Sequence, residues 1–289
     1  MTRSASGVVP AALLAGLLAG ALSCSLLTSL DGLSGGPNDP GDGGSKGDGG
    51  GTGDGGGNRN DAGPAAQSPY ASAVLADAPL AFFRLNESGG TVARSVVGSI
   101  TGKYEGNFAF GAAGAVGDGD PSVTFDGTTT RLDLGDVFAF EGTASFTLEC
   151  WIKPTVAGDT RFIFERKTLA TPTAGYTLYF GATYFTFSRS SQGNEFAYTG
   201  PNGPPRLDVW THTVITYDGT TSFMYLDGAV AGENQGASMP IGGGAGTFVI
   251  GDDAPGQFNK LEGQLDEVAI YDHALPAARI LAHFQAAKR

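Results

Sequence analysis

Short runs of alternating apolar and polar residues run through the chain after Pro69 and predict β-strands. From Ser145 to Ile152, apolar Phe146, Leu148, Cys150 and Ile152 alternate with Thr147, Glu149 and Trp151. Since successive side chains of a strand point to opposite faces, this pattern predicts a half-buried strand with Glu149 and Trp151 towards solvent. Similar runs predict strands over Tyr176–Phe180, Tyr184–Phe187, Phe248–Asp252 and Leu265–Tyr271.

A tight hairpin and one helix complete the predicted elements. Thr213–Tyr217 and Ser222–Leu226 flank Asp218-Gly219, and glycine reaches the positive φ that such a turn needs. Helical spacing is clear only over Pro276–Ala287, where proline suits the first helical position and an apolar stripe follows. Many short strands with so little helix predict a sandwich or a barrel.

The N-terminus has the pattern of an export signal. Arg3 precedes an apolar run from Val8 to Leu22, which is short and glycine-interrupted, as in a signal peptide. The run ends in Ala21-Leu22-Ser23-Cys24, which resembles a bacterial lipobox, so residues 1–24 are interpreted as a signal peptide with Cys24 lipidated. Ser25 after the cysteine, rather than Asp, fits sorting to the outer membrane or cell surface. Ordinary secretion and an uncleaved anchor remain alternatives.

Residues 25–68 are interpreted as a disordered linker. Between Asp31 and Gln67 the chain is mostly Gly, Asp, Asn, Ser and Pro, and such a segment cannot bury enough apolar surface to fold. Its Gly-Asp repeats lack the regular spacing of calcium-binding nonapeptides. A flexible tether of about 40 residues spans roughly 35 Å, which would hold a domain away from a membrane.

Composition and charge narrow the class of partner. The 289 residues carry a net charge of −12 with a sequence pI of about 4.5, which argues against nucleic acid, because phosphates attract clustered Lys and Arg. There are two cysteines. Cys150 shares the strand face of Phe146 and Leu148, so we expect a buried thiol, and a lipidated Cys24 could not pair with it.

Five motifs in order carry a family resemblance over residues 69–289. They are Ala78–Thr91, Val123–Gly127, Phe146–Pro154, Trp210-Thr211-His212 leading to Tyr217-Asp218-Gly219, and Leu265–Leu275 with the final helix. Together they resemble the laminin-G-like jelly-roll domains of the concanavalin A-like superfamily. The resemblance implies an all-β sandwich of two antiparallel sheets with a short C-terminal helix. This fold carries lectins, adhesion modules, enzyme appendages and glycan hydrolases, so it does not identify a ligand.

The sequence lacks the usual catalytic patterns of such enzymes. Glycan hydrolases of this fold place paired carboxylates on one strand face as a Glu-x-Asp-x-Glu run, and no such run is present. Glu262 and Glu267 are five apart and point to opposite faces of a regular strand. His212, His273 and His283 lie in no nucleophile elbow, and no His or Cys pair has zinc-ligand spacing. We therefore expect a protein that is not an enzyme.

A binding surface is the remaining prediction. Glu149 and Trp151 lie on the strand face opposite the core, and Tyr179 could extend an aromatic surface on which sugar rings stack. The loops Asn202–Pro205 and Gly242–Gly246 are further candidates. The aromatic residues could instead fill the core. Three hypotheses follow: an envelope-tethered module binding glycan or surface protein, a structural or assembly subunit of an envelope complex, and an unrecognised glycan-active enzyme.

A structural calcium ion is the cofactor that the resemblance implies. Asp266 alternates with Val268 and Ile270, so it should share their core-facing side, and a bare buried carboxylate is costly. In similar domains an Asp here helps hold calcium with an acid near the N-terminal strands. Ser95 stands where relatives often carry that Asp, which leaves Asn86, Glu87 and Asp126 as substitute oxygen ligands. Backbone N–H groups around Asp266 would be an alternative to the ion.

Overall fold

The computed structural model describes residues 68–168, 172–200, 205–234, 241–253, 256 and 260–288. The predicted signal peptide, Cys24 and residues 25–67 of the predicted linker lie outside these residues. Among the described residues, no helix is both long and apolar enough to span a membrane.

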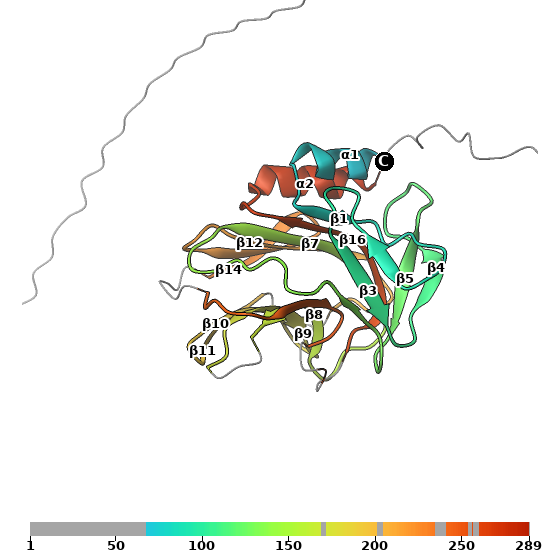
Figure 1. Cartoon of the computed structure of the whole chain (residues 1–289). Coiled ribbons are helices and arrows are strands. Elements are labelled where there is room, and N and C mark those ends of the chain that lie inside the picture. The colour runs from blue at the N-terminus through green and yellow to red at the C-terminus, as the bar shows by residue number, and fades with distance from the viewer. Residues whose placement is uncertain are drawn as a thin grey trace, which may run out of the picture. The chain divides into compact units, whose positions relative to one another are not determined.

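Two antiparallel sheets face each other as a sandwich (Figure 1). Sheet A has the order β14-β13-β12-β7-β16-β5-β4, with β1 also paired to β16. Its strands are β1 (Ala81–Phe83), β4 (Ala109–Ala113), β5 (Pro121–Asp126), β7 (Phe146–Pro154), β12 (Thr211–Tyr217), β13 (Ser222–Leu226), β14 (Ala229–Asn234) and β16 (Glu262–Tyr271). Sheet B has the order β11-β10-β9-β8-β15-β6-β3-β2. Its strands are β2 (Val92–Arg94), β3 (Thr101–Glu105), β6 (Arg131–Asp133), β8 (Arg161–Lys167), β9 (Gly175–Phe180), β10 (Phe185–Ser191), β11 (Asn194–Thr199) and β15 (Thr247–Ile250).

The strands predicted from the alternating pattern are present, with ends shifted by a few residues. The β12–β13 hairpin turns at Asp218-Gly219 as predicted, with Gly219 at a φ of +98°. The Asp218 carboxylate accepts hydrogen bonds from the N–H groups of Thr220 and Thr221, which fixes the turn.

The main core lies between the sheets. Phe146, Leu148, Cys150 and Ile152 of β7 all point into it, as the alternation predicted. From sheet B, alternate residues such as Leu178 and Phe180 meet them. Burial of each large apolar side chain contributes about 1.5–3 kcal/mol, so this layer supplies most of the driving force for folding.

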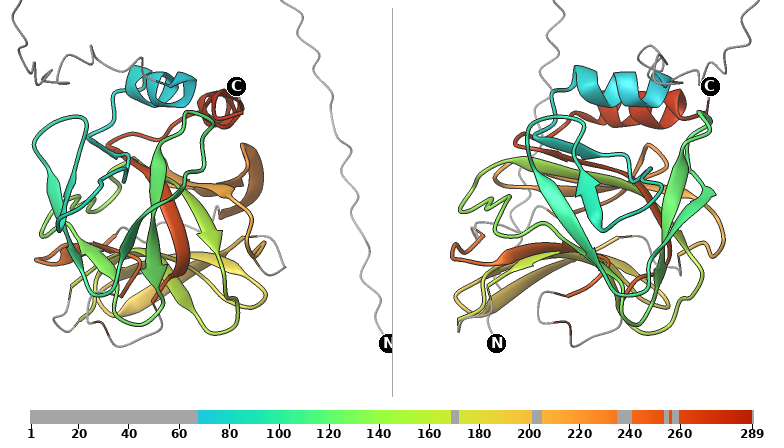
Figure 2. Two further views of the ribbon diagram at one scale, coloured as in Figure 1. Left: turned by 90° about the vertical axis from the view of Figure 1, so that its right-hand side faces the viewer. Right: turned by 45° about the vertical axis from the view of Figure 1, so that its right-hand side comes forward.

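A second core covers the outer face of sheet A. Helices α1 (Pro69–Ala76) and α2 (Ala277–Ala286) lie side by side on this face, as both views of Figure 2 show. Tyr70 and Val74 of α1 and Ile280 of α2 pack there against Trp151 of β7. β7 is therefore buried on both faces, and the prediction of a half-buried strand is wrong.

Local sequence explains where each helix starts. The predicted helix near the C-terminus is present as α2, with Pro276 immediately before its first residue. α1 was not predicted, although Ser68 caps it by accepting a hydrogen bond from the N–H of Ala71 at 3.1 Å. Pro69 then occupies the first helical position, where no N–H is needed.

A β-bulge in β16 changes which face Asp266 occupies. The register with β7 shifts between Asp266 and Ala269, and Glu267 takes a φ of +52°. Asp266 pairs with Trp151 on the outer face of sheet A, whereas Val268 and Ile270 point into the main core. Asp266 is fully buried, as expected, but the prediction that it shares a face with Val268 and Ile270 is wrong.

Candidate functional site

Glu149 and Trp151, predicted to face solvent as a ligand surface, are covered by the helices. Glu149 is 0% exposed and Trp151 is 4% exposed. The indole ring stacks on Phe284 of α2, with ring centroids 5.9 Å apart, and lies 5.0 Å from the His212 ring. The prediction that these two side chains form an open face is therefore wrong, because alternation along β7 does not reveal what packs on its outer side.

The Glu149 carboxylate is instead the centre of a buried hydrogen-bond network. Oε1 accepts from the Tyr70 hydroxyl at 2.9 Å and lies 2.8 Å from His212 Nε2. Oε2 accepts from the Tyr271 hydroxyl at 3.1 Å. His283 Nδ1 lies 3.1 Å from both oxygens. Donors from α1, β12, β16 and α2 thus converge on a single strand residue, which satisfies the requirement that a buried charge be paired.

The electrostatics of this network favour an ion pair. Burial alone would raise the pKa of Glu149, but the charge of His283 and the histidine hydrogen bonds outweigh it and hold that pKa below its usual value. Burial would likewise lower the pKa of His283, yet Glu149 and Asp77 raise it above its usual value. Both shifts favour a protonated His283 ring beside the Glu149 carboxylate inside the molecule.

His283 extends the network to the first helix. Its Nε2 lies 2.8 Å from the Asp77 carboxylate and 3.1 Å from the carbonyl oxygen of Ala73. Arg279 of α2 donates to the same Asp77 carboxylate at 2.8–2.9 Å. The network thus holds both helices against sheet A, and it involves two of the three histidines considered as catalytic bases.

A second polar cluster lies around the bulge in β16. The carboxylates of Asp118, Asp120 and Glu267 offer oxygens within 4.8 Å of one another. The Nη2 of Arg84 contacts all three, with 2.6 Å to Asp120 and 2.7 Å to Glu267. One guanidinium therefore contacts three carboxylates. A fourth acid, Asp266, directly precedes Glu267 in the chain.

Two oxygens of this cluster lack partners. Oδ1 of Asp266 and Oε2 of Glu267 are buried without a hydrogen bond among the described residues. Burial raises the pKa of Glu267 to about 8, and burial together with the Glu267 charge raises that of Asp266. An excess of buried carboxylate oxygens over donors fits the oxygen set of a hard divalent cation such as calcium, with Arg84 balancing part of the charge.

The residues predicted to ligate calcium are only partly brought together. Asn86 joins the cluster, because its Nδ2 donates to Asp120 at 3.1 Å. Glu87 instead accepts from the Tyr104 hydroxyl and from the N–H of Arg94. Asp126 accepts from the N–H groups of residues 128–130 in a turn. The sequence analysis did not predict Asp118 and Asp120 as ligands. They are far from Glu267 in the chain, and only folding brings their loop next to the bulge in β16.

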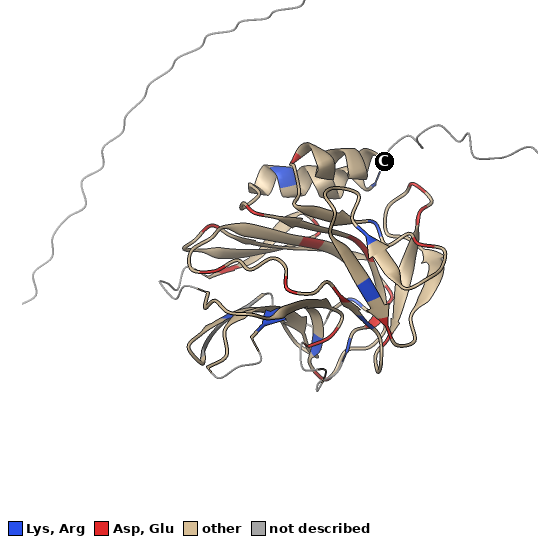
Figure 3. Cartoon of the chain, in the orientation of Figure 1, with Lys and Arg blue, Asp and Glu red and all other residues tan. Residues whose placement is uncertain are grey.

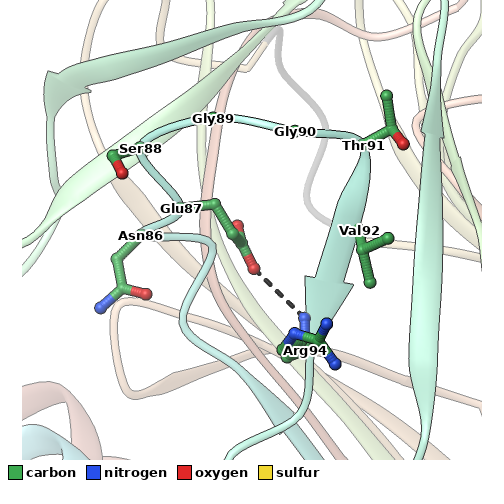
Figure 4. A pocket seen from close by; sticks show the side chains of 8 residues that line it. All are labelled: Asn86, Glu87, Ser88, Gly89, Gly90, Thr91, Val92 and Arg94. Carbon is green, nitrogen blue, oxygen red and sulfur yellow. Dashed lines mark hydrogen bonds between the residues drawn. The ribbon is translucent and has the colours of Figure 1, made fainter.

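Beside this cluster a shallow pocket of about 500 Å³ is lined by one loop (Figure 4). Its residues are Asn86, Glu87, Ser88, Gly89, Gly90, Thr91, Val92 and Arg94. The Glu87 carboxylate spans the loop to the backbone of Arg94, which stabilises its shape. The pocket lining is about equally polar and apolar and contains no aromatic ring, so it offers no stacking surface.

The outer face of sheet B carries an aromatic cluster that includes the predicted Tyr179. Phe162 and Thr186 flank Tyr179 on the neighbouring strands. The ring centroids of Phe162 and Tyr179 are 5.7 Å apart, and Tyr184 meets Tyr179 edge-on at 6.2 Å. Tyr179 and Tyr184 are partly exposed. We call Phe162, Tyr179 and Tyr184 the sheet B aromatic cluster.

A row of polar side chains crosses the same face next to this cluster. Glu165, Thr177 and Ser188 are direct cross-strand neighbours on β8, β9 and β10. The Thr177 hydroxyl donates to Glu165 at 3.1 Å. All three polar side chains are buried, so Tyr179 and Tyr184 are the partly exposed groups of this region, and aromatic rings are the groups that stack on sugar rings.

The two loops predicted as binding sites and the distribution of basic residues give little further support for a binding site. Asn202 to Pro204 lie outside the described residues, and Gly242 packs against the β10 backbone. Over the described chain, basic positions are scattered across α2 and both sheets without a continuous stripe (Figure 3).

Comparisons with known proteins agree with this architecture. A sequence model of the concanavalin A-like lectin/glucanases superfamily matches residues 126–281. No curated protein matches the sequence. Among solved structures, domain 4 of AbnA, a GH43 extracellular arabinanase from Geobacillus stearothermophilus in complex with arabinotriose, is similar with a TM-score of 0.56 and 17% identity, covering 72% of this chain and 97% of that chain.

Toxin domains are similar to the same extent. The binding domain of Paraclostridial Mosquitocidal Protein 1 has a TM-score of 0.56 and 13% identity, covering 71% of this chain and 52% of that chain. The botulinum neurotoxin serotype G binding domain has a TM-score of 0.54 and 10% identity, covering 72% and 50%. This chain thus spans about half the length of the toxin chains that it matches. At these identities the likeness establishes the fold alone.

Proposed function

Because the chain belongs to the concanavalin A-like lectin/glucanase superfamily, we propose that residues 69–289 form a non-catalytic module that binds an extracellular glycan. The observation that carries this proposal is the pair of partly exposed rings, Tyr179 and Tyr184, in the sheet B aromatic cluster. Aromatic faces stack on the apolar side of a sugar ring, and tyrosine hydroxyls pair with its hydroxyl groups.

The compared structures support this choice of ligand class. The AbnA domain was determined with arabinotriose, and both toxin proteins are described as binding domains. The sequence has no Glu-x-Asp-x-Glu run, and His212 and His283 are engaged with Glu149. These features favour recognition over hydrolysis.

A glycan-array screen of the full chain tests the proposal. We expect binding to a defined set of glycans, at least tenfold weaker after Tyr179→Ala and retained after Tyr179→Phe, which keeps the ring. Phe223→Ala, which removes a partly exposed ring from sheet A, is the matched control and should bind normally. Unchanged binding by Tyr179→Ala would place the site elsewhere, and release of shorter sugars from a bound polysaccharide would exclude a non-catalytic role.

We also propose that the cluster of Asp118, Asp120 and Glu267 holds a structural calcium ion. The two unpartnered buried oxygens of Asp266 and Glu267 support it. Since the folded-state pKa of Glu267 is raised to about 8, its ionisation costs stability as pH rises towards that value, and a bound cation removes this cost. Calcium should therefore raise Tm more at about pH 8.5 than at about pH 6.

Thermal unfolding with calcium or with chelator measures this effect. The double change Asp118→Asn with Asp120→Asn should abolish the calcium response. Asp126→Asn should keep the response, because that residue holds a turn and is not in the cluster. An equal Tm with and without calcium at both pH values would exclude the ion.

Finally, we propose that the module is tethered to the cell envelope through lipidated Cys24 and the linker that follows. The support is the charged start, the apolar run and the small residue before Cys24. Cell fractionation of Cys24→Ala should move the protein from membrane to soluble fractions, whereas Cys150→Ala should stay membrane-bound. Equal membrane association of the Cys24→Ala variant would contradict lipidation.

A further inference from the structure

Helix α1 is held to the rest of the domain by a small number of identifiable contacts. It has eight residues, of which Tyr70, Ala71 and Val74 are buried. Its polar connections are the Tyr70 hydroxyl to Glu149, and Asp77 and the Ala73 carbonyl to α2. A helix this short is not stable alone in water, so its structure depends on these contacts.

His283 of α2 is a second link between α1 and the buried Glu149, in addition to the direct bond from the Tyr70 hydroxyl. Nδ1 faces the Glu149 carboxylate, and Nε2 faces the Asp77 carboxylate and the Ala73 carbonyl. Every one of these partners is an acceptor. An imidazolium donates from both nitrogens, whereas neutral imidazole donates from one and presents a lone pair from the other. Both contacts can therefore be made only by the protonated ring.

The charged and titratable groups around His283 come from every element packed on it. Glu149 of β7 and Asp77 of α1 contact it directly, and Arg279 of α2 shares Asp77. The Tyr70 ring of α1 lies 6.3 Å away, and His212 of β12 and Tyr271 of β16 reach it through Glu149. Two carboxylates and one guanidinium surround the ring, so the local charge is balanced when the His283 ring is protonated and positive.

We propose that protonation of His283 is a clasp that docks α1 onto the outer face of sheet A, and that its deprotonation releases the helix. On release, the Tyr70 hydroxyl leaves Glu149 and the Trp151 side of the second core loses part of its cover.

The direction of the pH dependence follows from the two shifted groups. The pKa of His283 is raised in the docked state by Glu149 and by Asp77, and only Asp77 leaves with α1, so the Asp77 share of the stabilisation is lost as pH rises through the docked-state pKa. The pKa of Glu149 is held low by His283 and His212, which stay in place when α1 undocks, so Glu149 adds no pH dependence of its own in this range. Docking is therefore tightest in mildly acidic solution and weakens above neutrality.

Hydrogen exchange of the full chain, resolved by residue and corrected for intrinsic rates, tests the clasp from about pH 5.5 to about pH 9. Protection of the α1 amides from Ser72 to Ala76 should fall with a slope of up to about tenfold per pH unit above neutrality, because one proton is released on undocking. The amides of Leu148 and Cys150 in β7 should not follow. Global Tm is a poorer measure, since Glu267 also titrates in this range.

Variants separate the clasp from a purely structural role. His283→Gln should make α1 protection independent of pH, whereas His273→Gln, at a partly exposed histidine, should keep the wild-type slope. If His283→Gln does not fold, Asp77→Asn provides the test, because its new amide can donate to a neutral Nε2 and should flatten the slope. A flat wild-type profile, an unchanged slope in His283→Gln or Asp77→Asn, or an NMR titration showing neutral His283 at about pH 6 would each overturn the proposal.

Discussion

The outer faces of the two sheets begin from a similar pattern and end in different environments. Each has a glutamate on a central strand, Glu149 on β7 and Glu165 on β8, and both side chains are buried. Around Glu149, hydrogen-bond partners come from the helices α1 and α2 and from the strands β12 and β16. Over Glu165, the described residues contribute no helix, and the row of Thr177 and Ser188 lies beside partly exposed rings. The covered face stabilises the domain, and the other face carries the features of a binding surface.

The largest expected difference between the faces comes from removing each glutamate. Glu149→Ala should lower the free energy of unfolding by about 5 kcal/mol, because His283 and two tyrosine hydroxyls lose a buried partner. Glu165→Ala should cost less, because β8 and β9 stay joined by their backbone hydrogen bonds, whereas Glu149 holds two helices to the sheet. Urea denaturation at about pH 6 measures the loss of unfolding free energy in both variants. Equal losses would mean that the two glutamates contribute equally to stability.

Removing one large ring from each face should give the next effect. Trp151→Ala should cost about 4 kcal/mol, because the indole packs between Phe284 and His212 in the second core. Tyr179→Ala should cost about 1 kcal/mol or less, given its partial exposure, and should act on ligand binding instead. Denaturation curves combined with the glycan screen check both parts, and a destabilised Tyr179→Ala would make that ring a packing residue.

The smallest effect concerns a threonine on each face. Thr147 donates to the His273 carbonyl at 2.8 Å and accepts from the N–H of Leu275 at 2.9 Å, which fixes the segment leading into α2. Thr147→Val should cost about 2 kcal/mol by leaving two buried backbone groups unpaired. Thr177→Val removes one bond to Glu165 and should cost about 1 kcal/mol. Thermal unfolding measures both variants, and Thr147→Val should have the lower Tm. A lower Tm for Thr177→Val would contradict the larger structural role given to Thr147.

Sequence reasoning recovered the strands because each strand's pattern is local. The inward positions of β7 follow from period-two alternation alone, and Asp218-Gly219 fixes its own hairpin turn. The five ordered motifs extended this to the whole sandwich. These signals depend on residues close together in the chain, which is why they could be interpreted without coordinates.

The errors arose where distant segments meet. Alternation separates two faces of β7 but does not state that α1 and α2 cover Glu149, even though Ser68-Pro69 was a readable helix start. The bulge at Asp266 reverses that residue's face, and no adjacent glycine or proline signals it. Asp118 joins the acidic cluster through Arg84, a contact across 34 positions. Tyr179 was predicted as part of a binding surface because it is aromatic. Its cross-strand neighbours Phe162 and Thr186 follow only from the pairing of β8, β9 and β10.

The side-by-side helices also fix how this domain would be presented on a support. Ser68, where the described chain enters α1, and the end of α2 at Ala286 both belong to the layer over sheet A (Figure 2). A coupling group or fusion partner joined at either of these points therefore leaves from that side. Sheet B then points outward, so a bead, sensor chip or cell displaying the domain through either end would offer the Tyr179 face to the surrounding solution.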